Sequence, residues 1–152
     1  MTIRLAIQSD ARAITEVLQS LKEYPRYRQD ALDVLEKKIL TNLRTAFGRT
    51  VFVALLESRV IGFIVVHWFV PLTAPLEGFV SNLFVHAEFS NFGAGTALLE
   101  AVILESRAKG CSRLALNNWR DKISFQRGFY AKHGFVEKPL SARFVLQFEG
   151  SV

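Results

Sequence analysis

The residues that favour β-strands are concentrated in the middle of the chain, and this grouping limits the folds that the chain can adopt. Residues 50–58 (TVFVALLES) and 59–70 (RVIGFIVVHWFV) are rich in β-branched and aromatic side chains. A short polar turn near 57–59 separates them, which predicts an antiparallel hairpin. Pro71 and Pro75 end the second strand. The centre of the fold is therefore predicted to be a β-sheet.

Two amphipathic helices are expected before this hairpin. A first strand over residues 3–7 leads to Ser9 or Asp10, either of which can cap a helix. Apolar residues then recur at helical spacing on both sides of a break at Pro25. The first set is Ile14, Val17, Leu18 and Leu21, and the second is Leu32, Leu35, Ile39 and Leu43.

After the hairpin, strand and helix patterns alternate. A strand over 79–86 precedes a helix that Gly110 ends, and residues 112–118 (SRLALNN) form the next strand. A last helix is expected over 119–133, followed by a half-buried strand in which Ala142, Phe144, Leu146 and Phe148 alternate. This order predicts the α/β class, in the α+β arrangement of a central mixed β-sheet flanked by about four helices. The strand–helix–strand unit in the middle is expected to be a right-handed crossover.

Composition limits the class of protein. The 152 residues are expected to form a single domain, and half of them are hydrophobic, which favours a packed globule. A net charge of +5 without a run of basic residues suits an anionic ligand and does not indicate nucleic acid. One cysteine excludes an internal disulfide, and the apolar stretch 60–72 is too short to cross a membrane. We expect a cytoplasmic protein without membrane contact.

Gly93 and Gly95 stand between a predicted strand and a predicted helix. Bare backbone there exposes N–H groups and the positive end of the helix dipole, which suits a phosphate. A tight turn without a ligand explains the glycines equally well. The sequence after Gly95 lacks the Lys-Ser/Thr of a P-loop, and Leu98 stands where a dinucleotide fingerprint needs its third glycine.

These residues resemble the GNAT superfamily of acyl-CoA-dependent N-acyltransferases. Its pyrophosphate motif, Gln/Arg-x-x-Gly-x-Gly/Ala, is similar to residues 90–95 (SNFGAG), which precede the pair Leu98 and Leu99. Residues 80–89 (VSNLFVHAEF) resemble its central strand, and 127–135 (RGFYAKHGF) match its FY-x-x-x-GF motif. The start of the chain, a strand and then an aspartate before a helix, is also similar. Ser90 departs from the motif, since the family has Gln or Arg there.

The resemblance implies an N-acetyltransferase that moves an acetyl group from acetyl-CoA to a primary amine of a small molecule, peptide or protein. The amine would attack the thioester directly, and coenzyme A would be released. Backbone groups of the central strand would bind the pantetheine arm, and the glycine motif would bind the diphosphate. Asn118, or alternatively Asn117, and Phe125 are expected beside the cofactor, and two tyrosines beside the acceptor. The cofactor-binding residues are Leu83, Phe84, Val85, Asn91, Phe92, Gly93, Ala94, Gly95, Thr96, Asn118 and Phe125; the substrate-binding residues are Tyr24 and Tyr27.

The proton donor implied for the departing thiolate is Tyr130, since a thiol pKa of about 8.5 lies below a tyrosine pKa of about 10. The base is left unassigned. Many family members carry an acid on the central strand, where this chain has Ser81 and Asn82. A water chain to His67, Glu77 or His86 is one alternative, and a purely structural role for each of the three is another.

Two further readings of the sequence stay open. A non-catalytic acyl-CoA-binding module of the same fold would account for Ser90 and for the absent carboxylate. A basic nucleic-acid-binding domain lacks a helix-turn-helix signature or a clustered basic face, so no nucleic-acid partner is expected. No metal site is expected, and a homodimer is one of the oligomeric states left open.

Overall fold

The computed structural model describes residues 1–45 and 47–149. The chain divides into two compact units, Met1–Asn117 and Asn118–Val152. The first unit holds the sheet and three long helices, and the second holds two short helices and the C-terminal segment.

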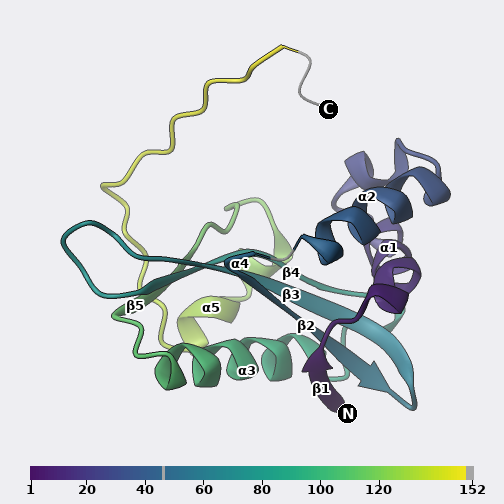
Figure 1. The fold of residues 1–152 in the computed structure, drawn as a ribbon, viewed down its shortest axis with the longest axis horizontal. Helices are drawn as coiled ribbons and strands as arrows, with labels where there is room; N and C mark the ends of the chain where they lie inside the picture. The colour runs from purple at the N-terminus through teal and green to yellow at the C-terminus, as the bar shows by residue number, and fades with distance from the viewer. Residues whose placement is uncertain (46, 150–152) are drawn as a thin grey trace. The chain divides into compact units, whose positions relative to one another are not determined.

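The first unit is built on a five-stranded mixed sheet in the order β1-β2-β3-β4-β5 (Figure 1). The predicted hairpin is confirmed, with an antiparallel pair formed by β2 and β3. The pairs β1–β2 and β3–β4 are also antiparallel, whereas β5 lies parallel to β4. The bounds of the strands are β1 Thr2–Leu5, β2 Arg49–Leu56, β3 Arg59–Phe69, β4 Glu77–Val85 and β5 Arg113–Leu116.

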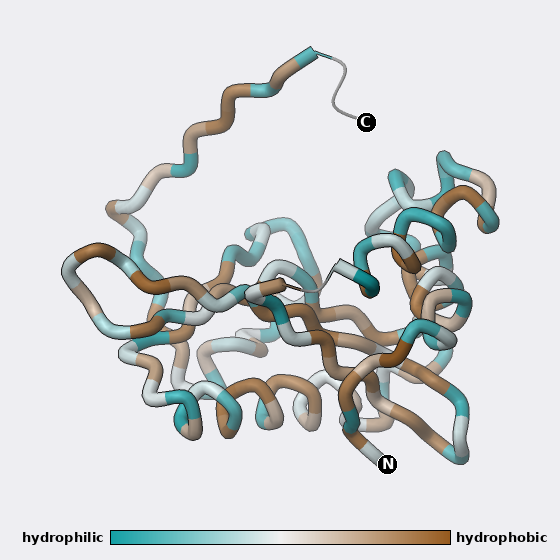
Figure 2. Tube along the Cα trace, in the orientation of Figure 1, coloured by the Kyte–Doolittle hydropathy of each residue, from teal (hydrophilic) through white to brown (hydrophobic). Residues whose placement is uncertain are grey.

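Helices cover both faces of this sheet. Helix α3 (Ala94–Ala108) lies against β2, β3 and β4, and Figure 1 shows it along one face, with α1 (Ala11–Ser20) and α2 (Leu32–Arg44) on the other side. In Figure 2 the hydrophobic colour runs along the central strands that the helices cover. Short 3₁₀ turns complete the unit: η1 Gln8–Asp10, η2 Pro25–Arg28 and η3 Ala87–Phe89. The core beneath α1 includes Ile14, Val17, Leu18, Val53, Val60 and Phe63.

Asp10 stands at the start of α1, as the sequence predicts, but its carboxylate does not cap the helix. It accepts hydrogen bonds from Arg4 Nη1 and Nη2 at 2.7 and 2.9 Å, and from the Ile7 backbone N–H at 2.8 Å. Burial by itself would raise the pKa of Asp10, but these hydrogen bonds outweigh it, so the pKa is lowered. The buried carboxylate therefore fastens β1 to the turn that begins α1.

The second unit differs from the sequence prediction in two ways. The single helix expected over 119–133 is wrong: α4 (Ile123–Gln126) and α5 (Phe129–Lys132) are separated at Gly128, whose φ of 63° is left-handed. The described residues therefore contain five α-helices, where about four were expected. The strand expected over 142–148 is also wrong. These residues pair with no strand, and Phe144 is 93% exposed. An alternating pattern favours a strand only where a second strand supplies hydrogen-bond partners.

Candidate active site

The strands β4 and β5 pair along only part of β4. Their register runs from Glu77 opposite Arg113 to Val80 opposite Leu116, and β4 continues to Val85. In the part of the chain that the structure describes, no strand pairs with residues 81–85 on the β5 side. The sheet therefore has an open edge on its parallel side, and a bound chain could add to it as an extra strand.

The direction of the backbone groups on this edge follows from one hydrogen bond. His86 N–H donates to the Ile61 carbonyl on β3 at 2.8 Å. Hydrogen-bonded and non-bonded pairs alternate along an antiparallel ladder, so Phe84 directs its backbone groups toward β3. Leu83 and Val85 then direct theirs toward the open edge. The backbone of these two residues is thus available for a ligand.

The chain passes from β4 through η3 to the N-terminus of α3. Gly93 is the N-cap residue, with a φ of 75°, and a Cβ built on it would meet no atom within 4 Å. The first backbone bond of the helix runs from Ala97 N–H to the Gly93 carbonyl. The N–H groups of Ala94, Gly95 and Thr96 precede it, and no side chain caps the helix. At the predicted glycine motif, the N-terminus of α3 therefore has, among the described residues, unbonded N–H groups and no atom near the Cβ position of Gly93.

Arg59 supplies a positive charge near Ser90, the position that departs from the family pattern. Its guanidinium lies 4.9 Å from the ring centroid of Phe89, the residue before Ser90. Among the described residues no carboxylate forms an ion pair with Arg59. The sequence reasoning missed this residue, because Arg59 is distant from the glycine motif along the chain.

The two tyrosines predicted beside the acceptor lie against β4. The Tyr24 and Tyr27 ring centroids are 4.9 and 5.8 Å from that of Phe84, both edge-on. The Arg26 guanidinium lies 4.8 Å from the Tyr27 centroid and donates to the Tyr27 hydroxyl at 2.9 Å. We call Tyr24, Tyr27 and Phe84 the aromatic cluster. It lies on the sheet face covered by α1, since Phe84 also packs on Phe63 of the core.

The three candidate proton acceptors have different surroundings. Glu77 is buried and accepts from Arg113 Nε at 2.7 Å, so an ion pair occupies its carboxylate. The His86 ring accepts from the Glu88 N–H at 3.3 Å and packs on Phe89. His67 Nε2 lies 2.9 Å from Ser81 Oγ, on the strand residue that the family comparison singles out. Of the three, only His67 contacts the side chain of a β4 residue in the stretch that does not pair with β5.

A comparison with known families assigns the chain. The model of the acetyltransferase (GNAT) domain matches residues 47–137, which is more than half of the sequence. The chain belongs to the GNAT acetyltransferase family. The predicted membership of the GNAT superfamily is thereby confirmed. A search of curated proteins finds no match.

Solved structures confirm the GNAT fold. A transcriptional regulator from Bacillus halodurans C-125 has a TM-score of 0.81 at 19% identity, over 97% of this chain and 99% of its own. A ribosomal-protein-alanine N-acetyltransferase from Brucella melitensis biovar Abortus 2308 has a TM-score of 0.73 at 20% identity, over 97% of this chain and 100% of its own. An acetyltransferase from Trypanosoma brucei has a TM-score of 0.73 at 25% identity, over 95% of this chain and 99% of its own. Within the described ranges of this GNAT chain, no helix has the length and apolar character to span a membrane.

The remaining predicted site residues of the GNAT chain lie in the second unit. Ser124 Oγ donates to Asn118 Oδ1 at 3.0 Å, and the Arg120 guanidinium lies 5.2 Å from the Phe125 ring centroid. The Tyr130 ring contacts Phe129 and Phe135 edge-on, at 5.0 and 5.9 Å between centroids. The roles of Asn118, Phe125 and Tyr130 stay predictions.

Proposed function

We propose that this GNAT acetyltransferase transfers an acetyl group from acetyl-CoA to a primary amine of a small molecule or peptide. One observation carries the proposal: the open edge of β4 leads directly along the chain to the uncapped N-terminus of α3. An extended arm with amide groups and a diphosphate at one end, as in coenzyme A, suits these two features in that order.

The residues present fit such a donor. Leu83 and Val85 supply the outward N–H and C=O groups that pair with the pantetheine amides. The backbone from Asn91 to Thr96 supplies N–H donors for the diphosphate, apart from the Phe92 N–H, which donates to the Phe89 carbonyl at 3.3 Å. The space at Gly93 admits the diphosphate without a Cβ in the way. Phe92 is exposed beside this loop, and Ala94 is buried beneath it.

Bound acetyl-CoA supplies an activated thioester carbonyl. The Val85 N–H, which is directed to the open edge, donates to the carbonyl oxygen as negative charge develops there. The aromatic cluster holds the acceptor on the opposite side of β4 from α3. Tyr130 is our proton donor for the leaving sulfur, and this role rests on the family motif rather than on a measured distance.

Titration calorimetry with acetyl-CoA, followed by a thiol-release assay with a panel of primary amines, tests the proposal. We expect saturable binding and release of coenzyme A with at least one amine. Binding without release for every amine would instead support the non-catalytic module. Without saturable binding, the assignment of the donor fails.

Tyr130→Phe tests the acid separately. Loss of the hydroxyl is expected to reduce kcat by about 10²–10⁴-fold with little change in the Kd of acetyl-CoA. Turnover unchanged from wild type would remove Tyr130 from the mechanism and leave the transferase assignment intact.

A further inference from the structure

His67, Ser81 and Asn82 form a hydrogen-bonded group on β3 and β4. Ser81 Oγ donates to Asn82 Oδ1 at 3.0 Å and lies 2.9 Å from His67 Nε2. The Ser81 side chain therefore connects an imidazole nitrogen to an amide oxygen. The sequence alone does not pair these residues, because the register between β3 and β4 shifts by one residue at this point.

The group lies where the open edge begins. Val80 is the last β4 residue that pairs with β5, and Ser81 follows it. The shift in register falls between Val65 and Val66, so Ser81 is the additional residue of a β-bulge. Bulges re-aim side chains next to active sites. Here the bulge brings the Ser81 hydroxyl to the inner end of the edge that we assign to the pantetheine arm.

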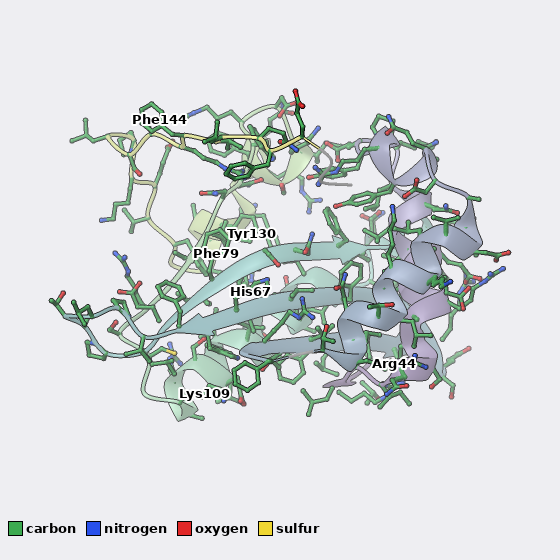
Figure 3. All side chains as sticks on the ribbon, turned by 45° about the horizontal axis from the view of Figure 1, so that its top comes forward. Arg44, His67, Phe79, Lys109, Tyr130 and Phe144 are labelled. Carbon is green, nitrogen blue, oxygen red and sulfur yellow. The ribbon has the colours of Figure 1, made fainter. Side chains whose placement is uncertain are left out.

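The group also shares a sheet face with the aromatic cluster. Side chains alternate along β3, so His67 lies on the same face as Phe63. Phe63 packs on Phe84 with ring centroids 6.0 Å apart, and Asn82 precedes Phe84 by two residues. Figure 3 shows His67 on β3 beside Phe79, its partner on β4. An acceptor held by the aromatic cluster would thus have Asn82 and Ser81 next along the strand.

We propose that His67, acting through the Ser81 hydroxyl, takes the proton that the acceptor amine loses during acetyl transfer. The inference rests on the proposed function. The acceptor enters as the neutral amine. As its lone pair forms the N–C bond, its N–H becomes acidic and passes a proton to Ser81 Oγ, and the Ser81 proton passes to His67 Nε2. The C–S bond breaks and Tyr130 protonates the thiolate. His67 then releases its proton to water, and Tyr130 regains a proton from water.

The hydroxyl of Ser81 has one hydrogen, which it donates to Asn82 Oδ1 in the structure and which it can turn to donate to His67 Nε2. In the relay it faces the neutral imidazole that carries its own hydrogen on Nδ1. Asn82 Oδ1 is then free to accept an N–H of the amine. The Asn82 amide thus positions the amine nitrogen, and His67 receives the proton of this nitrogen through Ser81.

The surroundings of His67 favour its neutral form. Burial, and to a smaller extent the charge of Arg49, lower its pKa. Arg49 lies opposite His67 on β2, and α2 contributes the Asn42 carbonyl, which accepts from Arg49 Nη2. Further along this face, Glu77 on β4 is paired with Arg113 on β5. A neutral imidazole can accept a proton at neutral pH, which a charged one cannot.

The test compares kcat as a function of pH, at saturating acceptor, in wild type, His67→Gln and Ser81→Ala. Glutamine can keep a hydrogen bond to Ser81 but cannot store a proton. We expect wild-type kcat to fall on the acid side as His67 becomes charged. In both site variants kcat should drop about 10²–10³-fold and lose this acid limb, with the KM of acetyl-CoA within about twofold.

An acid limb retained in His67→Gln, or kcat within about twofold of wild type, would overturn the relay. Ser81 is exposed, so Ser81→Ala does not threaten the fold, and normal kcat in that variant would also overturn it. Wild-type release of coenzyme A is measured first. Its absence refutes the transferase itself, whereas release that is unaffected in both variants refutes only the relay.

Discussion

The two ends of α3 provide a matched pair of glycines for testing the diphosphate site. Gly93 precedes the helix with a φ of 75°, and Gly110 follows it with a φ of 71°. A Cβ on either would meet no atom within 4 Å. Alanine in this left-handed region costs about 1 kcal/mol. Gly93→Ala and Gly110→Ala should therefore lower Tm equally, by about 2–4 °C for a chain of this size.

Only Gly93→Ala should weaken the binding of acetyl-CoA. Its methyl group would occupy the open space before the helix, where we place the diphosphate. Loss of one charge-assisted hydrogen bond, about 1.5–3 kcal/mol, corresponds to a Kd about 10–150-fold higher. Thermal unfolding and titration calorimetry measure both quantities on the same samples. Equal Kd values for the two variants, with equal losses in Tm, would refute the placement of the diphosphate at Gly93.

Three further predictions concern charged groups. Arg59→Gln should raise the Kd of acetyl-CoA several-fold and reduce its salt dependence, measured by calorimetry at two ionic strengths; an unchanged salt dependence would contradict a phosphate contact. Arg49→Met should raise the pKa of His67 toward about 6.5, because a neighbouring positive charge is removed; NMR titration of the histidine ring signals checks this, and a downward shift would contradict it. The lowered pKa of Asp10 contributes stability that is present above the unfolded value of about 3.9 and is lost as pH falls through the folded value. Asp10→Asn should lower the free energy of unfolding, measured with urea, by about 1.5–3 kcal/mol at neutral pH. Between pH 5 and 2 the free energy of unfolding should fall less steeply in this variant than in wild type.

Local patterns predicted those features that depend on neighbours along the chain. The hairpin β2–β3 and the helices α1 to α3 follow from side-chain periodicity, and the family from short motifs around Gly93 and Tyr130. Periodicity is a property of one segment, so it does not require knowledge of the partner. It failed at Gly128, where one left-handed residue divides an apparently continuous helix, and over 142–148, where no strand pairs with the alternating segment.

The sequence by itself determined the order of elements from β1 to β5, the glycine motif and the absence of a carboxylate at positions 81 and 82. The tertiary structure decided which residues meet at the site. A single extra residue at the β4 bulge joins Ser81 to His67, and the aromatic cluster forms because η2 folds back onto β4. Contacts between segments far apart in the chain depend on strand register and on how helices pack on the sheet. The one-residue bulge on β4 and the packing of the helices are not visible in the pattern of a single segment, so only the folded chain reveals these contacts.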